Sequence, residues 1–241
     1  MPIHLIWGDD TASKERSIEK LIQKTIDPAW ASINISRLDG SDSSQVNRAL
    51  EEVRTPPLGN GSRIILVQKN PFCNNCSTEL AEKFIQTIEL IPEQTHLVLS
   101  HTLKPDGRMK TTKIIQKLIK SNQAYEAKFL LPAIWDEAGK KTLIERTSQE
   151  LGIFLEEEAI FALVEAIGND SSRLNSELQK ISLLQESKNK NSPDKTLLIS
   201  AETVNELING ITTNIFEIGN TLLAGNTGEA LSKIDILLDS G

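Results

Sequence analysis

The residues that come nearest to a catalytic motif follow the first apolar run of the chain. A phosphate-binding loop has the pattern Gly-x4-Gly-Lys-Ser/Thr, in which backbone N–H groups and the lysine hold the phosphates. Gly8 and Lys14 match this pattern, but Ser13 replaces the second glycine and Glu15 replaces the hydroxyl residue. A Cβ at position 13 restricts the backbone, and a carboxylate at position 15 repels phosphate. We expect no ATP hydrolysis, whether this loop is a degenerate nucleotide site or never was one.

Neighbouring residues also argue against ATP hydrolysis. Asp9 and Asp10 add negative charge to the loop itself. The apolar run that ends at Gln68 would need acidic residues there to hold Mg²⁺ and polarise a water molecule. It continues instead into Lys69 and Asn70. An active P-loop NTPase that uses Lys14 is kept as an alternative function.

Cys73 and Cys76 form a single Cys-x-x-Cys pair. A structural zinc site needs four ligands, and the sequence has no second cysteine pair, so we expect no metal site. A redox motif would sit at a strand-to-helix turn of a thioredoxin-like unit, whereas this pair follows a strand within a polar loop. We interpret the cysteines as incidental thiols, with a thiol oxidoreductase as the alternative.

A turn rich in proline and glycine carries one apolar side chain. Pro56 and Pro57 prevent a helix from continuing and stiffen the backbone, and Gly59 and Gly61 follow. Leu58 therefore stands on a rigid turn. It either folds back onto the sheet, or acts as an apolar wedge that enters a hydrophobic pocket of a partner.

A basic stretch covers residues 104–120. Arg108, Lys110 and Lys113 lie in its first half, and Lys117 and Lys120 continue it. A solvated helix face explains such a stretch. The alternative is contact with the phosphate backbone of DNA, which needs several clustered cations.

Composition limits the class of protein. The 241 residues are 39% hydrophobic and 24% charged, which is typical of a folded protein with a core and argues against intrinsic disorder. The net charge of −7 argues against a free-standing nucleic-acid binder. No apolar run approaches the roughly 18 residues of a membrane span, and no secretory signal is visible at the N-terminus. We expect a cytoplasmic protein without a membrane partner.

In the first half, short apolar runs alternate with amphipathic patterns. Strands are expected at residues 3–7, 32–38, 63–68, 96–100 and 124–131, and helices at 13–25, 46–53, 78–90 and 111–121. This alternation predicts an α/β domain with a parallel sheet and helices on both faces.

From Trp135 onward helical periods dominate. Helices are expected at residues 135–151, 156–167 and 171–184, a polar loop at 185–195, then a helix that Ser200 caps, and further helices at 215–223 and 228–238. The last of these must bury its apolar face against something.

Several short segments stand in an informative order. They are Leu-Ile-Trp-Gly-Asp-Asp at 5–10, Leu-Asp-Gly at 38–40, Pro-Pro-Leu-Gly-Asn-Gly-Ser-Arg-Ile-Ile-Leu-Val at 56–67, Gly-Asn-Asp-Ser-Ser-Arg-Leu-Asn-Ser-Glu-Leu-Gln-Lys at 168–180, Asn-Ile-Phe-Glu at 214–217 and Leu-Leu-Ala-Gly-Asn at 222–226. Their order and spacing resemble the delta subunit of the bacterial DNA polymerase III clamp loader.

That resemblance implies an AAA+ module. It would comprise a RecA-like α/β domain over residues 1–138, a helical lid domain over 139–211 and the start of a helical collar domain over 212–241. The family's delta subunit does not hydrolyse ATP, so no cofactor is expected. It opens the sliding clamp by pushing hydrophobic residues at the end of a helix into a clamp pocket, and by position these would be Pro57 and Leu58.

The resemblance also implies partners. These are the sliding clamp, the other clamp-loader subunits of a hetero-pentamer joined through the collar, and primed DNA indirectly, all within the DNA polymerase III holoenzyme. Arg173 falls where AAA+ proteins place a lid arginine that senses nucleotide. Without a nucleotide site it would serve the lid helix or the interface between domains.

Overall fold

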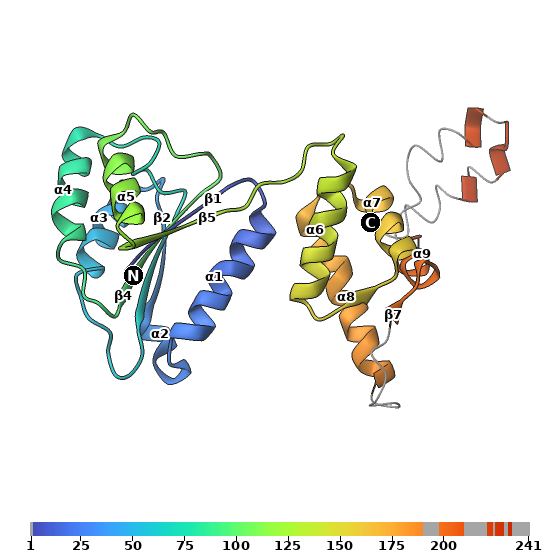
Figure 1. Ribbon diagram of the computed structural model, residues 1–241, viewed down its shortest axis with the longest axis horizontal. Coiled ribbons are helices and arrows are strands. Elements are labelled where there is room, and N and C mark those ends of the chain that lie inside the picture. Colours follow the sequence, from blue (N-terminus) through green and yellow to red (C-terminus); the bar gives the residue numbers. More distant parts are fainter. Residues whose placement is uncertain (1, 190–197, 210–220, 224, 229–230, 233–241) are drawn as a thin grey trace. The chain divides into compact units, whose positions relative to one another are not determined.

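The computed structural model describes residues 2–189, 198–209, 221–223, 225–228 and 231–232 (Figure 1). The chain divides into two compact units, Met1–Leu131 and Pro132–Gly241. The predicted division at 138 and 211 stays a prediction, because most of residues 212–241 lie outside the described ranges. In the described part of the chain, no helix is long and apolar enough to span a membrane.

The first unit alternates strands and helices as the sequence predicts. Its elements are β1 (Ile3–Trp7), α1 (Thr11–Thr25), the 3₁₀ helix η1 (Pro28–Trp30), α2 (Ala31–Asn34), β2 (Ile35–Asp39), α3 (Ser43–Glu52), β3 (Arg63–Gln68), α4 (Thr78–Ile88), β4 (Thr95–His101), α5 (Lys110–Lys120) and β5 (Ala124–Lys128). The strands form one parallel sheet in the order β2-β3-β4-β1-β5. The predicted parallel α/β sheet is therefore confirmed.

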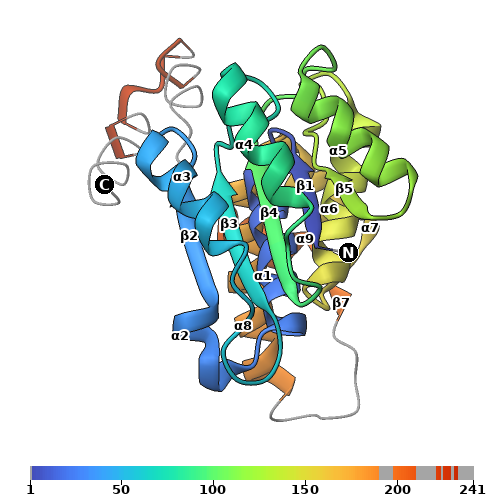
Figure 2. The same ribbon diagram turned by 90° about the vertical axis from the view of Figure 1, so that its left-hand side faces the viewer.

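Both faces of this sheet are buried. Helices α3, α4 and α5 cover one face, and α1 covers the other (Figures 1 and 2). In β3, Ile65 and Val67 face the first group of helices, whereas Ile64 and Leu66 face α1. All four side chains are fully buried, which explains why this strand is continuously apolar rather than alternating.

The second unit is mainly helical. Its elements are α6 (Glu137–Glu150), β6 (Phe154–Leu155), α7 (Glu157–Ile167), α8 (Ser171–Asn189), β7 (Leu198–Ile199) and α9 (Ala201–Asn209). The pair β6 and β7 is parallel and was not expected, because two-residue strands are too short to show a period in the sequence. Ser200 caps α9 as predicted, with its Oγ accepting from the Thr203 N–H at 3.4 Å.

Several predicted boundaries are wrong, and the strand expected at 124–131, for example, ends at Lys128. The strand expected at 32–38 begins at Ile35, because Asp27 and Pro28 start a helical segment that runs through η1 and α2. The loop expected at 185–195 is helical up to Asn189, since that part lacks a helix breaker and holds residues of good helix propensity. Residues 190–195 and most of the helices expected at 215–223 and 228–238 lie outside the described residues.

Gly8 allows Phe129, the residue after β5, to lie close beside the end of β1. It has φ +133°, and a Cβ there would come within 1.8 Å of the Phe129 carbonyl oxygen. The Phe129 N–H also donates to the Trp7 carbonyl at 2.8 Å. This glycine is therefore required by the packing of two backbones.

We predict that Gly8→Ala destabilises the protein by about 3 kcal/mol or more, because backbone cannot move away as a flexible side chain could. Urea unfolding followed by circular dichroism measures this. Gly107→Ala is the control, since a Cβ there meets nothing within 4 Å, and it should change stability by less than about 1 kcal/mol. Equal midpoints for the two variants would contradict the packing argument.

Candidate functional site

The connection between β1 and α1 is too short to wrap a phosphate. Only Gly8, Asp9 and Asp10 separate the strand from the helix. The Asp10 carboxylate caps α1 by accepting from the Ser13 N–H at 2.9 Å, and Asp10 is fully buried. The helix N-terminus, where a nucleotide phosphate would bind, thus already holds a negative charge from the protein itself.

Lys14 also forms a hydrogen bond with the protein's own backbone. Its side chain is only 4% exposed, and its Nζ donates to the His101 carbonyl at 3.3 Å. Desolvation lowers the pKa of the Lys14 ammonium. The same carbonyl accepts from the Gly8 N–H at 3.1 Å. Lys14 therefore ties α1 to the end of β4 rather than reaching outward, while Glu15 is exposed.

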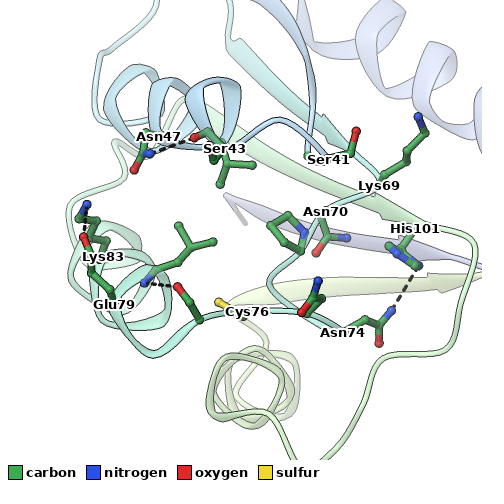
Figure 3. Close-up of a pocket in the computed structure, with 16 residues that line it drawn as sticks. Ser41, Ser43, Asn47, Lys69, Asn70, Asn74, Cys76, Glu79, Lys83 and His101 are labelled. Atoms are coloured by element: carbon green, nitrogen blue, oxygen red, sulfur yellow. Dashed lines mark hydrogen bonds and ion pairs between the residues drawn. The ribbon is translucent and has the colours of Figure 1, made fainter.

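A polar pocket of about 790 Å³ lies at the carboxyl ends of β2 and β3 (Figure 3). Lys69 in its wall pairs with Asp39 at 3.3 Å, and Lys83 pairs with Glu79 at 2.9 Å. Gly8, Ser13, Lys14 and Glu15 do not line it. The pocket adjoins that loop only through His101, whose carbonyl accepts from Gly8 and Lys14, and its lysines are already paired with carboxylates.

The two cysteines differ in their surroundings. Cys73 lies in the loop between β3 and α4, as the sequence predicts, but it is fully buried against the core, and its carbonyl accepts from the Thr112 hydroxyl at 3.2 Å. Burial raises the pKa of the Cys73 thiol to about 11 and also raises the pKa of the half-buried Cys76. Neither thiol is activated in the way that a redox centre requires. Among the described residues no His, Cys, Asp and Glu cluster could hold a metal ion.

Leu58 does not fold back onto the sheet. Its side chain is 51% exposed, whereas Pro57 beside it is half-buried. Its backbone N–H donates to Asn34 Oδ1 and its carbonyl accepts from Asn34 Nδ2, both at 2.9 Å. The turn thus has a fixed backbone and an apolar side chain that faces solvent.

Further contacts hold the rest of this turn. Gly59 has φ +74°, and a Cβ there would come within 2.5 Å of the Trp30 ring. Gly61 forms a bridge with Ile26, and the Ser62 N–H donates to the Thr25 carbonyl at 3.0 Å. The sequence indicated a stiff turn through its prolines, but the roles of Trp30 and Asn34 depend on tertiary contacts that leave no local signal.

The basic stretch lies mainly on one side of α5. Lys110, Lys113, Lys117 and Lys120 are exposed, and their spacing of three or four residues gathers them along the helix. Among the described residues none of these lysines forms an ion pair. Arg108 differs, because its Nη2 pairs with the Asp106 carboxylate at 2.8 Å and its hydrogen bonds lower the pKa of Asp106 to about 2.

Arg173 lies in the first turn of α8. Its backbone N–H donates to the Asp170 carboxylate at 2.9 Å. Asp170 also accepts from the Ser172 N–H at 3.0 Å, so it caps this helix. A role of Arg173 in the lid or at a domain interface stays a prediction.

The sequence pattern of the family described as "DNA polymerase III, delta subunit" matches residues 4–127. The chain belongs to this family. The match covers the whole parallel sheet except the last residue of β5 and the first of β1. A search of curated proteins gives no sequence match to the chain.

Among solved structures, the Bacillus subtilis DNA clamp loader delta protein (YqeN) is similar with a TM-score of 0.75 and 19% sequence identity. The similarity covers 100% of this chain and 68% of that chain. It confirms the fold class, a RecA-like α/β sheet domain followed by helices. The Thermotoga maritima RuvB Holliday junction branch migration motor is similar with a TM-score of 0.44 and 10% identity over 92% of this chain and 68% of that chain. That likeness is too slight to carry an argument.

We predict that the folded protein resists thiol reagents. At pH 8 a thiol with a pKa of about 11 is ionised to roughly one part in a thousand. A chromogenic disulfide reagent should therefore label Cys73 only after urea unfolds the chain, and Cys76 more slowly than a free thiol. The variants Cys76→Ser and Cys73→Ser isolate each thiol. Rapid labelling of Cys73 in the folded protein would revive the thiol oxidoreductase alternative.

Proposed function

We propose that this chain is a non-hydrolysing clamp-loader subunit that binds the DNA sliding clamp and opens it. The observation that carries this proposal is the exposed side chain of Leu58 on an ordered turn. Asn34 orders this turn by forming hydrogen bonds with both the N–H and the carbonyl of Leu58. Membership of the delta subunit family supports the sliding clamp as the partner. Leu58 enters an apolar pocket of the clamp, and Pro57 packs at the edge of the contact.

Opening follows from binding alone. A closed ring is in equilibrium with an open form, and a ligand that binds the open form more tightly shifts the population towards it. Each tenfold preference contributes about 1.4 kcal/mol to this shift. No bond is made or broken by this subunit, so it needs no nucleotide of its own.

The alternative of an active P-loop NTPase is disfavoured by the loop geometry. The buried Asp10 carboxylate occupies the N-terminus of α1, and Lys14 bonds to the His101 carbonyl. A nucleotide would have to displace both. In the proposed assembly, ATP acts on neighbouring subunits of the hetero-pentamer within the DNA polymerase III holoenzyme.

We expect Leu58→Asp to weaken binding to the purified sliding clamp at least about 100-fold. The variant loses the burial of one leucine and places a carboxylate against an apolar pocket. Isothermal titration measures this, and wild-type affinity should be the same with and without ATP. Thermal unfolding should change little, because the side chain is half exposed.

Leu90→Asp is the matched control, because Leu90 is 54% exposed and belongs to the same unit. It should bind the clamp like the wild type. Equal affinities of the Leu58 and Leu90 variants would reject Leu58 as the contact.

The α5 lysines provide a second, weaker contact in this proposal. Primed DNA held by the loaded clamp would meet Lys110 and Lys113, with Arg108 beside them. Because Arg108 is paired with Asp106, it contributes less than the lysines. The contact is to phosphate and carries no sequence preference.

The double variant Lys110→Gln, Lys113→Gln should lower the slope of log K against log salt concentration by about 2. Fluorescence anisotropy with a primed template in the clamp-loader assembly measures it. Lys20→Gln, Lys24→Gln on α1 removes the same charge from the opposite face of the sheet (Figure 2) and should leave the slope unchanged. Equal slopes for both double variants would exclude the α5 contact.

A further inference from the structure

The buried side-chain amide of Asn34 sets the position of the exposed apolar residue Leu58. We propose that Asn34 is a positioning residue for the clamp contact, which it serves by holding the Leu58 backbone. This inference rests on the proposed function, because it concerns the same contact. Asn34 itself touches no partner, since its side chain is fully buried.

The contact uses both halves of the amide group. Nδ2 donates to the Leu58 carbonyl and Oδ1 accepts from the Leu58 N–H, and both distances are 2.9 Å. At neutral pH only asparagine and glutamine carry a donor and an acceptor in this arrangement, because an aspartate there is ionised and can only accept. The pair of bonds fixes the position and the orientation of the Leu58 peptide groups, as two bonds between neighbouring strands would.

Asn34 can act in this way because the sheet fixes its own position. It is the last residue of α2 and directly precedes β2, where Ile35 pairs with Ile64 of β3. The chain of contacts therefore runs from the sheet through Asn34 to a turn 24 residues further along. Trp30 supports the next residue of the turn, since its ring lies against Gly59.

An ordered turn favours binding. A flexible turn must lose conformational entropy when its side chain enters a pocket, and that cost is subtracted from the binding free energy. Because Asn34 already holds the Leu58 backbone in the free protein, the clamp meets a side chain whose direction is set. Loss of Asn34 should thus weaken the contact that Leu58 makes and no other.

A double-mutant cycle with the full chain separates this role from general stability. Asn34→Ala should weaken clamp binding roughly tenfold in the wild-type background and have no further effect in the Leu58→Ala background. Affinities are measured by isothermal titration at a temperature where circular dichroism shows all variants folded. A residue that only stabilises the fold would lower the unfolding temperature and leave the affinity of the folded protein unchanged.

Asn34→Asp gives a second readout if the alanine variant does not fold. An ionised carboxylate accepts from the Leu58 N–H but faces the Leu58 carbonyl oxygen without a proton to donate. The protonated acid donates to that carbonyl and restores both bonds. The affinity of this variant, taken relative to the wild type at each pH, should therefore recover as the pH falls.

The outcomes separate the two proposals. If Leu58→Ala weakens binding while Asn34→Ala and Asn34→Asp bind like the wild type, Asn34 is not a positioning residue and the proposed function stands. If the effects of Asn34→Ala and Leu58→Ala simply add, the positioning role is equally rejected. If Leu58→Ala binds like the wild type, the clamp contact itself is wrong, and the positioning role falls with it.

Discussion

Two hydrogen bonds between the Asn34 amide and the Leu58 backbone are the interaction on which this account depends. A surface turn normally leaves its polar groups to water, which permits it many conformations. Here one buried side chain satisfies both polar groups of a single residue at 2.9 Å each. The leucine side chain stays exposed while its backbone is tied to Asn34, the residue that directly precedes β2. A binding residue needs this combination of exposure and order.

The loop after β1 shows the opposite arrangement. Asp10 caps α1 and Lys14 bonds to the His101 carbonyl, so groups that could meet a ligand are turned inward and satisfied. Gly8, the one glycine that matches a phosphate loop, is needed because the Phe129 backbone lies against it. The strand and helix are arranged as they would be around a nucleotide, but their polar groups bond within the protein.

The sequence predicted the parts of this structure that local chemistry determines. The continuous apolar run of β3 and the alternation of strands with amphipathic helices were sufficient to predict the buried parallel sheet. The segment before β2 was mistaken for strand because Ile33 and Ile35 alternate with polar residues, although Asp27 and Pro28 begin a helix there. The contact of Asn34 with Leu58 joins residues far apart in the sequence, so no periodicity or motif could indicate it.

The most direct test of the central claim observes the Leu58 side chain in the complex. Leucine methyl groups are labelled selectively, and their NMR signals are followed as the sliding clamp is added until the complex is saturated. We expect the Leu58 methyl signals to shift and lose contact with solvent, while those of the similarly exposed Leu90 stay where they are. Unperturbed Leu58 signals in a saturated complex would contradict the central claim.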